Sequence, residues 1–506
     1  MKEKILSFLR QGLRLLAFAV ATGIFVSNIL FQTTVSYDDA ERVLIHHVLG
    51  SGIFSLALGA VLLFVLVILR KHLEKLQERK LFLFFSIFYG VIALFFILNI
   101  DMVLRADAES VALAAVQLGR GDLDTFRYGY LNLHPHQIGL VVYDAILDIF
   151  SRNHAIQFIM NYIFIIGTNY YLYAISKHLF DDHFTNLLTI VFSFCFLPQF
   201  FFIFFAYGNV PSFFFLTVAF YHLLKFTTTR HFKPMVITIL CAAAAVFLRK
   251  NTLIGVIAMI IFLVLDMFKK YTPKHLLIIA LLIIGTLLPS NMVYSYYAQK
   301  AGVEKAGIPS ILWVAMGTDI DNTVRGPGWF DVSVNSIYHT ANKDPDLAHD
   351  KGIQKIKDNI QKIQQEPERA LSFFTDKIIS QWCDPLFQSV WSGPLEACDQ
   401  KTYNGTLYSL YNGYKVEKLV AFCCRIYTIA LWGLLVLFLL KHGSHQSGWE
   451  LAFLFLIGGF LFHILWEAKS QYTYQYLSGL IPFGAYALSS LTKEGSSRLC
   501  RLLKNK

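Results

Sequence analysis

Long, nearly uninterrupted runs of apolar residues constrain this chain more than any other feature of its sequence. Each run is about 17–24 residues long, the length that crosses roughly 30 Å of bilayer hydrocarbon as an α-helix. Of the 506 residues, 55% are hydrophobic and only 15% are charged, whereas soluble proteins carry about 25% charged residues. A β-barrel would show alternating apolar and polar residues instead. The sequence therefore predicts an all-α polytopic membrane protein.

The apolar runs give a count of about twelve predicted transmembrane helices. The short basic loops and the basic tail at 493–506 all fall on one side, which the positive-inside rule makes cytoplasmic. Because twelve is an even number, both termini are expected on that side. The predicted spans are residues 8–30, 47–70, 81–100, 154–176, 185–205, 208–226, 234–250, 252–268, 275–297, 417–440, 449–466 and 472–491.

The spans and the loops between them divide the chain into four parts. We expect an N-terminal two-span hairpin at 1–80 and a transmembrane core at 81–297, which includes a large external loop at 101–153. An extracytoplasmic region at 298–416 precedes a C-terminal unit of three spans and a basic tail, at 417–506. The functional side of the molecule is therefore expected to be the extracytoplasmic side, where the polar loops gather.

The first large external loop carries two predicted interfacial helices. Segment 107–118 reads as an amphipathic helix with Asp107 in the N-cap position and Gly119 at its end. In the simplest interpretation Asp107 caps this helix and Glu109 favours its positive end. Segment 138–150 is apolar but too short to cross a membrane, so it is expected to lie at the interface.

The order of these elements resembles the first external loop of GT-C superfamily glycosyltransferases, which include the protein O-mannosyltransferases and the aminoarabinose transferases. An acidic residue opens a helix after a span, and GDLDTFRYGYLNLHPHQIG then leads into the second helix. Further likenesses are FLRKNTLIG (247–255), PSILWVAMGTD (309–319), PGWFD (327–331) and EAKSQYTYQYLSGLIPFGAYAL (467–488). The resemblance covers most of 81–490 and lies in the order and sidedness of short motifs.

The resemblance implies inverting transfer of a sugar from a polyprenyl-phosphate donor to a glycan, lipid or protein acceptor at the outer face. A carboxylate is ionised at neutral pH and can take the proton of an acceptor hydroxyl. Asp107 is the expected catalytic base, while Glu109 positions the acceptor or shares the role. Ala108 separates these two residues, although the acidic pair of the family is adjacent. The adjacent pair Asp38 and Asp39 is therefore the alternative site.

Cations should face the phosphate leaving group, on which negative charge develops during transfer. Arg249 and Lys250 fall at the outer end of a predicted span, where they either bind lipid phosphate or snorkel to headgroups. Lys469 is a third candidate unless it only pairs with Glu467. The residues expected to bind the substrates are Tyr128, Tyr130, His134, His136, Gln137 and Trp329.

No metal site and no certain cofactor are predicted, although a divalent cation is compatible with this chemistry. His134 and His136 flank Pro135, so they do not share a helix face. Cys383 and Cys398, both in the extracytoplasmic region, form either a disulfide or two free thiols. The net charge of +10 is spread over short loops rather than one basic face, which argues against a nucleic-acid partner.

Two other classes of function compete with sugar transfer. A transporter or a flippase for lipid-linked oligosaccharides would place charges or broken helices near the bilayer midplane, whereas the centres of these spans are almost free of charge. A non-catalytic assembly protein that binds partners through 298–416 fits the sequence as well. The favoured prediction is a glycosyltransferase in a bacterial plasma membrane. It would decorate cell-surface polysaccharide and contact membrane lipid.

Overall fold

Helices make up 79% of the computed structural model. Among the described residues there is one sheet, an antiparallel ribbon of β1 (Phe31–Val35) and β2 (Val43–His47) in which Phe31 pairs with His47. The ribbon falls almost wholly between the first two predicted spans, at 8–30 and 47–70. The structure describes residues 2–37, 41–100, 103–394, 405–442 and 448–504, with side chains up to residue 492.

Eight helices of the described chain are long and apolar enough to cross a membrane. A ninth span results if α10 (His183–Cys195) is counted together with the bent continuation at Leu197–Phe204, which turns by 52°. The prediction of an all-α polytopic membrane protein is thereby confirmed, while the count of twelve spans stays a prediction. The eight helices are α1 (Lys2–Leu30), α2 (Leu49–Ile68), α4 (Glu78–Asn99), α9 (Ala155–Phe180), α12 (Asn209–Thr229), η3 with α14 (Lys250–Lys269), α15 (Pro273–Ala301) and α21 (Lys415–Lys441).

Three further helices coincide with the remaining predicted spans. Two of them, α13 (Phe232–Leu248) and α22 (Trp449–Leu465), are apolar but only 17 residues long. The third, α24 (Ile481–Lys504), follows the short helix α23 (Tyr474–Gly479). A helix of 17 residues is about 25 Å long, so α13 and α22 are at the lower limit of what crosses the hydrocarbon layer.

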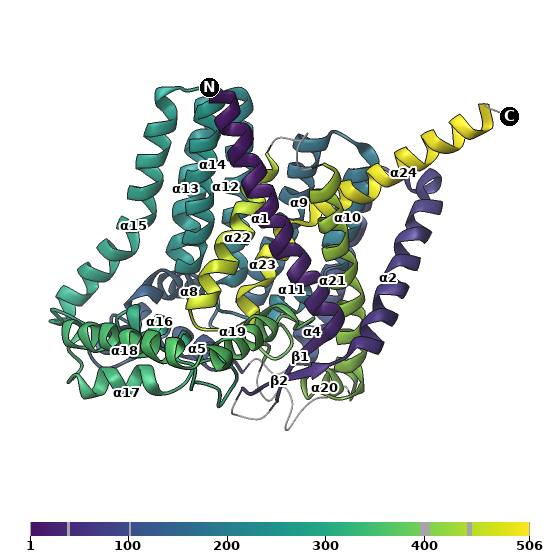
Figure 1. Cartoon of the computed structure of the whole chain (residues 1–506). Coiled ribbons are helices and arrows are strands. Elements are labelled where there is room, and N and C mark those ends of the chain that lie inside the picture. The colour runs from purple at the N-terminus through teal and green to yellow at the C-terminus, as the bar shows by residue number, and fades with distance from the viewer. Residues whose placement is uncertain (1, 38–40, 101–102, 395–404, 443–447, 505–506) are drawn as a thin grey trace.

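The polar elements gather at one end of the helical bundle (Figure 1). The N-terminal end of α1 and the C-terminal end of α24 lie at the opposite end. The gathered elements come from the ribbon, from the loop that follows α4 and from the long segment between α15 and α21. They are α5 (Asp107–Gly119), α6 (Asp124–Arg127), α7 (Tyr130–Leu133), η1 (Pro135–Gln137), α8 (Ile138–Phe150), α16 (Ile311–Gly317), α17 (Ser333–Thr340), α18 (Pro345–Gln365), α19 (Pro367–Trp382) and α20 (Gly405–Tyr411).

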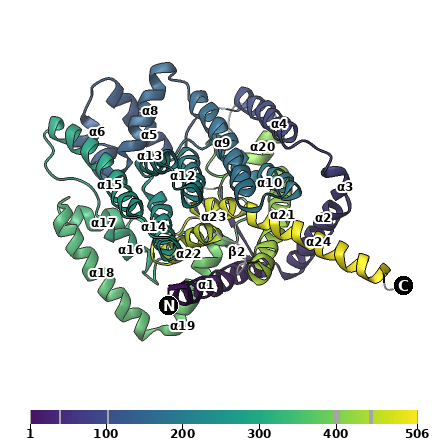
Figure 2. The same ribbon diagram turned by 90° about the horizontal axis from the view of Figure 1, so that it is seen from above.

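Burial separates central helices from peripheral ones. In its apolar window α12 is 67% buried, whereas α2 is 17% and α15 is 22% buried. Seen from above, α12, α14, α22 and α23 lie in the middle, with α15 and α18 on one side and α2 on the other (Figure 2). The exposed apolar faces of α2 and α15 suit contact with lipid, because lipid tails replace protein as the apolar surroundings.

A buried lysine fastens the polar layer to the bundle. The Lys377 ammonium on α19 is fully enclosed and donates hydrogen bonds to the carbonyl oxygens of Ile464 (2.9 Å) and Trp466 (2.7 Å), and to that of Gly317. Three carbonyl acceptors match the three N–H donors of an ammonium group, which offsets the cost of burying the charge. The lysine therefore ties α16 and α19 to the C-terminal end of α22.

One close approach of two helices sets the distance between the polar loop and the bundle. A Cβ atom at Gly139, near the start of α8, would lie 1.8 Å from the carbonyl oxygen of Phe247 on α13. Gly139→Ala must therefore push α8 away from α13, and we expect a loss of about 1–3 kcal/mol in the free energy of unfolding. Thermal unfolding in detergent measures this loss.

Gly23→Ala is the matched control for that substitution. Gly23 lies inside α1, where an added Cβ meets nothing within 4 Å. This change should leave stability the same or raise it by up to about 1 kcal/mol, because alanine favours helix over glycine. Equal melting temperatures for the two variants would contradict the close approach of α8 and α13.

Candidate functional site

The hydroxyl group of Tyr207 joins three segments of the polar layer. Tyr207 lies in the turn between η2 (Phe202–Phe204) and α12, and its hydroxyl donates to the Asp107 carboxylate at 2.9 Å. It accepts from the Gln137 amide at 2.8 Å and lies 3.2 Å from the Tyr130 hydroxyl. One donated and two accepted hydrogen bonds saturate a phenol oxygen, so the geometry of all three partners is fixed.

The Asp107 carboxylate is oriented by this phenol and not by capping its own helix. Asp107 is the first residue of α5, and the capping position belongs to Ala106, whose φ of 51° and ψ of −125° are unusual for a residue with a side chain. The interpretation of Asp107 as an N-cap is therefore wrong. Backbone strain of this kind persists where the surrounding structure enforces it, and it occurs often at functional sites.

Arg249 lies against the other side of Tyr207. Its guanidinium group donates to the Tyr207 carbonyl oxygen at 2.7 Å and is 4.7 Å from the centre of the Tyr207 ring. It also lies over the Tyr472 ring, at 5.5 Å. An arginine has five N–H donors, and the Arg249 guanidinium makes no other hydrogen bond with the described residues, so donors are left for an anion.

A second cation reaches the same region from the segment after α22. Lys469 pairs with Glu41 at 3.1 Å, and Glu41 also accepts from the Gln388 amide at 3.0 Å. Burial works to lower the pKa of the Lys469 amine, but the Glu41 and Glu467 carboxylates outweigh it and raise that pKa. Lys469 is therefore an ammonium ion at neutral pH. Its direct partner is Glu41, while Glu467 accepts a hydrogen bond from Tyr472 at 3.1 Å.

Aromatic rings form a wall beside Asp107. The His134 ring lies 4.8 Å from the Tyr130 ring, and both histidine rings are within 6.4 Å of Trp313, which stacks on Trp466 at 6.2 Å. Burial lowers the pKa of His136 to about 3 and also lowers the pKa of His134. Both imidazoles are thus neutral at pH 7 and can donate as well as accept hydrogen bonds.

The charge of Asp107 acts on several of these groups. Burial raises the pKa of the Tyr207 and Tyr130 phenols, and the nearby Asp107 charge raises both further. The same charge contributes to the raised pKa of Lys469. The structure therefore brings together Asp107, the aromatic wall and two cations from segments about 360 residues apart in the sequence.

The other predicted site residues lie apart from this cluster or on its edge. Glu109 is exposed on α5, and Lys250 is exposed next to Arg249; neither has a hydrogen-bond or ion-pair partner among the described residues. Tyr128 is 85% exposed and lines a separate groove with Arg127 and Lys305. Trp329 is fully buried and donates to the Ser380 hydroxyl at 3.0 Å, so its ring has no free face.

Two predictions involve residues that the structure does not describe. Asp38, Asp39 and Cys398 lie outside the described residues, so the alternative acidic pair and the disulfide stay predictions. Glu41, close to that pair in sequence, is described and contacts Lys469. Cys383 is buried at the end of α19.

Several residues of the cluster were not predicted to belong to the site. Tyr207 was missed because a tyrosine in a turn between two apolar runs is common at membrane interfaces. Glu41 and Trp313 were missed because their partners lie far away in the sequence, and Tyr472 belongs to the motif at 467–488 but was assigned no role. The signal that was present is their position: each follows or precedes an apolar run at the same predicted end of the molecule.

The described residues contain no group of three or more His, Cys, Asp or Glu side chains arranged to hold a metal ion. The site thus consists of a carboxylate, cations, neutral imidazoles and aromatic rings, a set suited to proton transfer and to binding an anion. The chain matches no protein-family model, no curated protein and no solved structure.

Removing the Tyr207 hydroxyl tests the hydrogen-bonded hub. Tyr207→Phe leaves the buried Gln137 amide without its acceptor and Asp107 without its donor, so we expect a loss of about 1–3 kcal/mol in the free energy of unfolding. Thermal unfolding of the purified protein measures it. Tyr128→Phe, at an exposed phenol that bonds to none of the described residues, should leave the melting temperature unchanged. A stable Tyr207→Phe variant would show that the hub does not hold the site together.

Proposed function

We propose that this protein is a membrane glycosyltransferase of the GT-C type, which moves a sugar from a polyprenyl-phosphate donor to an acceptor hydroxyl. The observation that carries the proposal is the position of Asp107, held by Tyr207 beside Arg249 and within the electrostatic reach of Lys469. A carboxylate that can accept a proton stands next to cations that can hold a phosphate. Inverting sugar transfer from a lipid phosphate needs this pair of functions.

In the proposed reaction the oxygen of the acceptor hydroxyl attacks the anomeric carbon of the donor sugar. Asp107 takes the hydroxyl proton. The bond between the anomeric carbon and the phosphate oxygen breaks, and its electron pair goes to the phosphate. A glycoside of inverted configuration and polyprenyl phosphate with one additional negative charge are formed, while the carboxyl group returns its proton to water.

Arg249 and Lys250 bind the phosphate in this proposal. Arg249 is positioned by its bond to the Tyr207 carbonyl oxygen and by two aromatic rings, so few of its conformations are lost when the donor binds. Lys250 is exposed beside it and contributes charge. Lys469 reaches the phosphate if Glu41 releases it, and otherwise keeps Glu41 in place.

The aromatic wall would contact the sugar. Trp313, His134 and Tyr130 present rings and polar atoms next to Asp107, and their neutral imidazole and phenol groups can hydrogen-bond sugar hydroxyls without competing for the phosphate. Gln137 is occupied by Tyr207 and acts through it. Glu109 and Tyr128 are exposed and would contact the acceptor.

The finer topology belongs to this proposal as well. We propose twelve spans, with α13, the bent α10 segment, α22 and α24 added to the eight long helices, in a plasma membrane. Both termini are then cytoplasmic and the site is extracytoplasmic, where a cell-surface polysaccharide would be decorated. Helices α5 and α16, which carry Asp107 and Trp313, lie at one end of the bundle (Figure 1), which supports an interfacial enzyme over a transporter with charges at the midplane.

Asp107→Asn tests the assigned base. Asparagine keeps an oxygen that can accept from Tyr207, so the variant should fold with a melting temperature close to wild type but lose transfer by about 100-fold or more. The assay offers the purified protein in nanodiscs a panel of polyprenyl-phosphate sugars and follows release of polyprenyl phosphate. Glu109→Gln and Asp39→Asn should reduce turnover only mildly. Full turnover in Asp107→Asn with loss in Asp39→Asn would move the base to the other acidic pair.

Arg249→Ala tests the assigned phosphate contact. Removal of a charge-assisted hydrogen bond to the donor should weaken donor binding by about 10–100-fold. Binding of a polyprenyl phosphate to the protein in nanodiscs provides the measurement. Lys233→Ala, an exposed cation at the opposite end of α13, is the control and should bind as wild type does. Unchanged affinity in Arg249→Ala would mean that this cation only meets lipid headgroups.

A further inference from the structure

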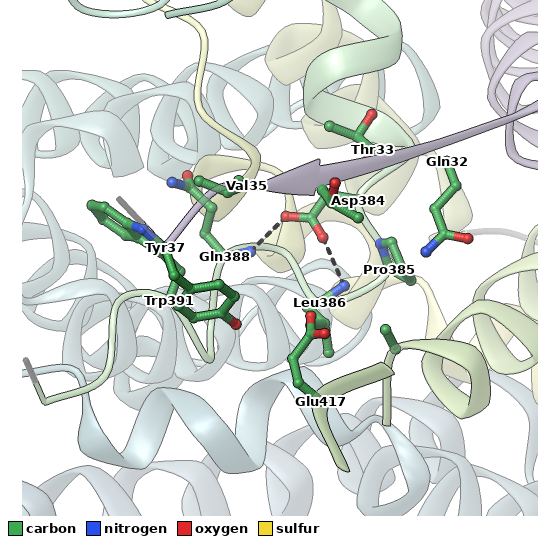
Figure 3. A pocket seen from close by; sticks show the side chains of 12 residues that line it. Gln32, Thr33, Val35, Tyr37, Asp384, Pro385, Leu386, Gln388, Trp391 and Glu417 are labelled. Atoms are coloured by element: carbon green, nitrogen blue, oxygen red, sulfur yellow. Dashed lines mark hydrogen bonds between the residues drawn. The ribbon is translucent and has the colours of Figure 1, made fainter. Parts of the chain in front are cut away.

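Two buried carboxyl groups of the polar layer, Asp384 and Glu417, face a small cavity under β1 (Figure 3). Polar groups of its lining are already bonded: Asp384 accepts from the Ser470 hydroxyl at 2.7 Å, and the Gln32 carbonyl oxygen accepts from Arg425 at 3.3 Å. The volume of the cavity is about 20 Å³. It has room for one water molecule beside the two acids.

A third buried acid, Asp144, lies in the middle of α8 and lines neither that cavity nor the groove beside Tyr128. Only 2% of Asp144 is exposed, whereas Ile149 and Phe150 on the same helix are exposed. Asp144 therefore lies on the buried face of α8. The helix packs on α5 (Figure 2) and approaches α13 closely at Gly139. A carboxyl group thus lies inside the contact between α8 and its neighbours.

No cation compensates Asp144 in the described part of the chain. Its Oδ2 atom has no hydrogen-bond partner there. The group that interacts with it is the side chain of Gln157 in the first turn of α9, whose carbonyl oxygen accepts from the His154 ring at 3.1 Å. On α8 itself the nearby titratable groups are Tyr143 and Asp148, and neither is a cation. Helices α5, α13, α15 and η1 present no charged group that contributes to the pKa of Asp144.

These surroundings favour the neutral form of Asp144. Burial raises the pKa of its carboxyl group, Gln157 lowers that pKa and the Asp148 charge raises it, with the result at about 8. A carboxylate at this place would lose its hydration without gaining a cation, whereas a protonated carboxyl group carries no charge. At pH 7 the helix α8 therefore packs over an uncharged acid.

We propose that Asp144 is a proton-controlled latch: α8 stays packed on its neighbours while the Asp144 carboxyl group is protonated, and moves away from them when the proton is lost. Loss of the proton to water leaves a charge that only water can stabilise in this region. Water reaches Asp144 when α8 moves, because the packed helix covers the group.

The latch acts on the candidate site because α8 is continuous with it. Gln137 directly precedes α8 and donates to the Tyr207 hydroxyl at 2.8 Å. Helix α5, which packs along α8, begins at Asp107. Displacement of α8 therefore removes a donor from the Tyr207 hydroxyl and a support from the helix that carries Asp107. The inference does not depend on the proposed sugar transfer.

The pH dependence of stability tests the latch. The unfolded chain releases the Asp144 proton near pH 3.8 and the folded protein near pH 8, so between these values only the folded protein holds it. The equilibrium constant of unfolding should rise about tenfold per pH unit up to pH 8 and then level off. Asp144→Asn and Asp144→Leu have side chains of similar shape without an acid, and they should lack this dependence. In thermal unfolding of the full chain in detergent, the wild type should lose about 2 °C per pH unit against each variant.

Hydrogen–deuterium exchange locates the change. Peptides from 138–150 of the wild type should lose protection above about pH 8, after correction for the chemical exchange rate, while those of Asp144→Asn keep it. Asp350→Asn, at an exposed carboxylate on α18, is the control and should follow the wild type in both measurements. The proposal is overturned if the wild type and Asp144→Asn have parallel melting profiles, or if protection of 138–150 in the wild type does not depend on pH.

Discussion

A single phenol oxygen connects the parts of this protein that come from different spans. The Tyr207 hydroxyl bonds to Asp107, to Gln137 and to Tyr130, while its backbone carbonyl holds Arg249. A carboxylate and a guanidinium group are thereby kept close together without forming a salt bridge that would neutralise both. The proposed chemistry depends on this separation, because the carboxylate must stay free for a proton and the cation for a phosphate.

Buried charges attach the polar layer to the helical bundle in a second way. Lys377 binds three carbonyl oxygens at the ends of two helices, and Lys469 binds Glu41 next to the β1–β2 ribbon. Breaking either contact would leave an ammonium ion in a poorly hydrated place, at a cost of several kcal/mol. Such contacts specify how the external elements sit on the bundle more strictly than apolar packing does, because hydrogen bonds have preferred directions.

A feature could be predicted from the sequence when the interaction that produces it joins residues close together in the chain. The helices at 107–119 and 138–150 were predicted almost to the residue, since amphipathic periodicity and glycine at a helix end act locally. Asp107 was placed correctly on its helix, but its capping role was wrong, because the partner that orients it is 100 residues away. Trp329 is typical of a sugar-binding aromatic residue in sequence, and only its position in the fold shows that both ring faces are covered.

The sequence by itself determined that the chain forms apolar helices in a membrane and that its polar loops are concentrated between particular spans. Those properties depend on the hydrophobic effect and on backbone hydrogen bonding in lipid. Both are decided by the composition of a segment of about twenty residues. The tertiary structure alone decided which loop residues meet: Tyr207 with Asp107, Lys469 with Glu41, and Asp384 with Glu417 around one cavity. Contacts between residues far apart leave no pattern in a single sequence, because their selection depends on how the helices pack.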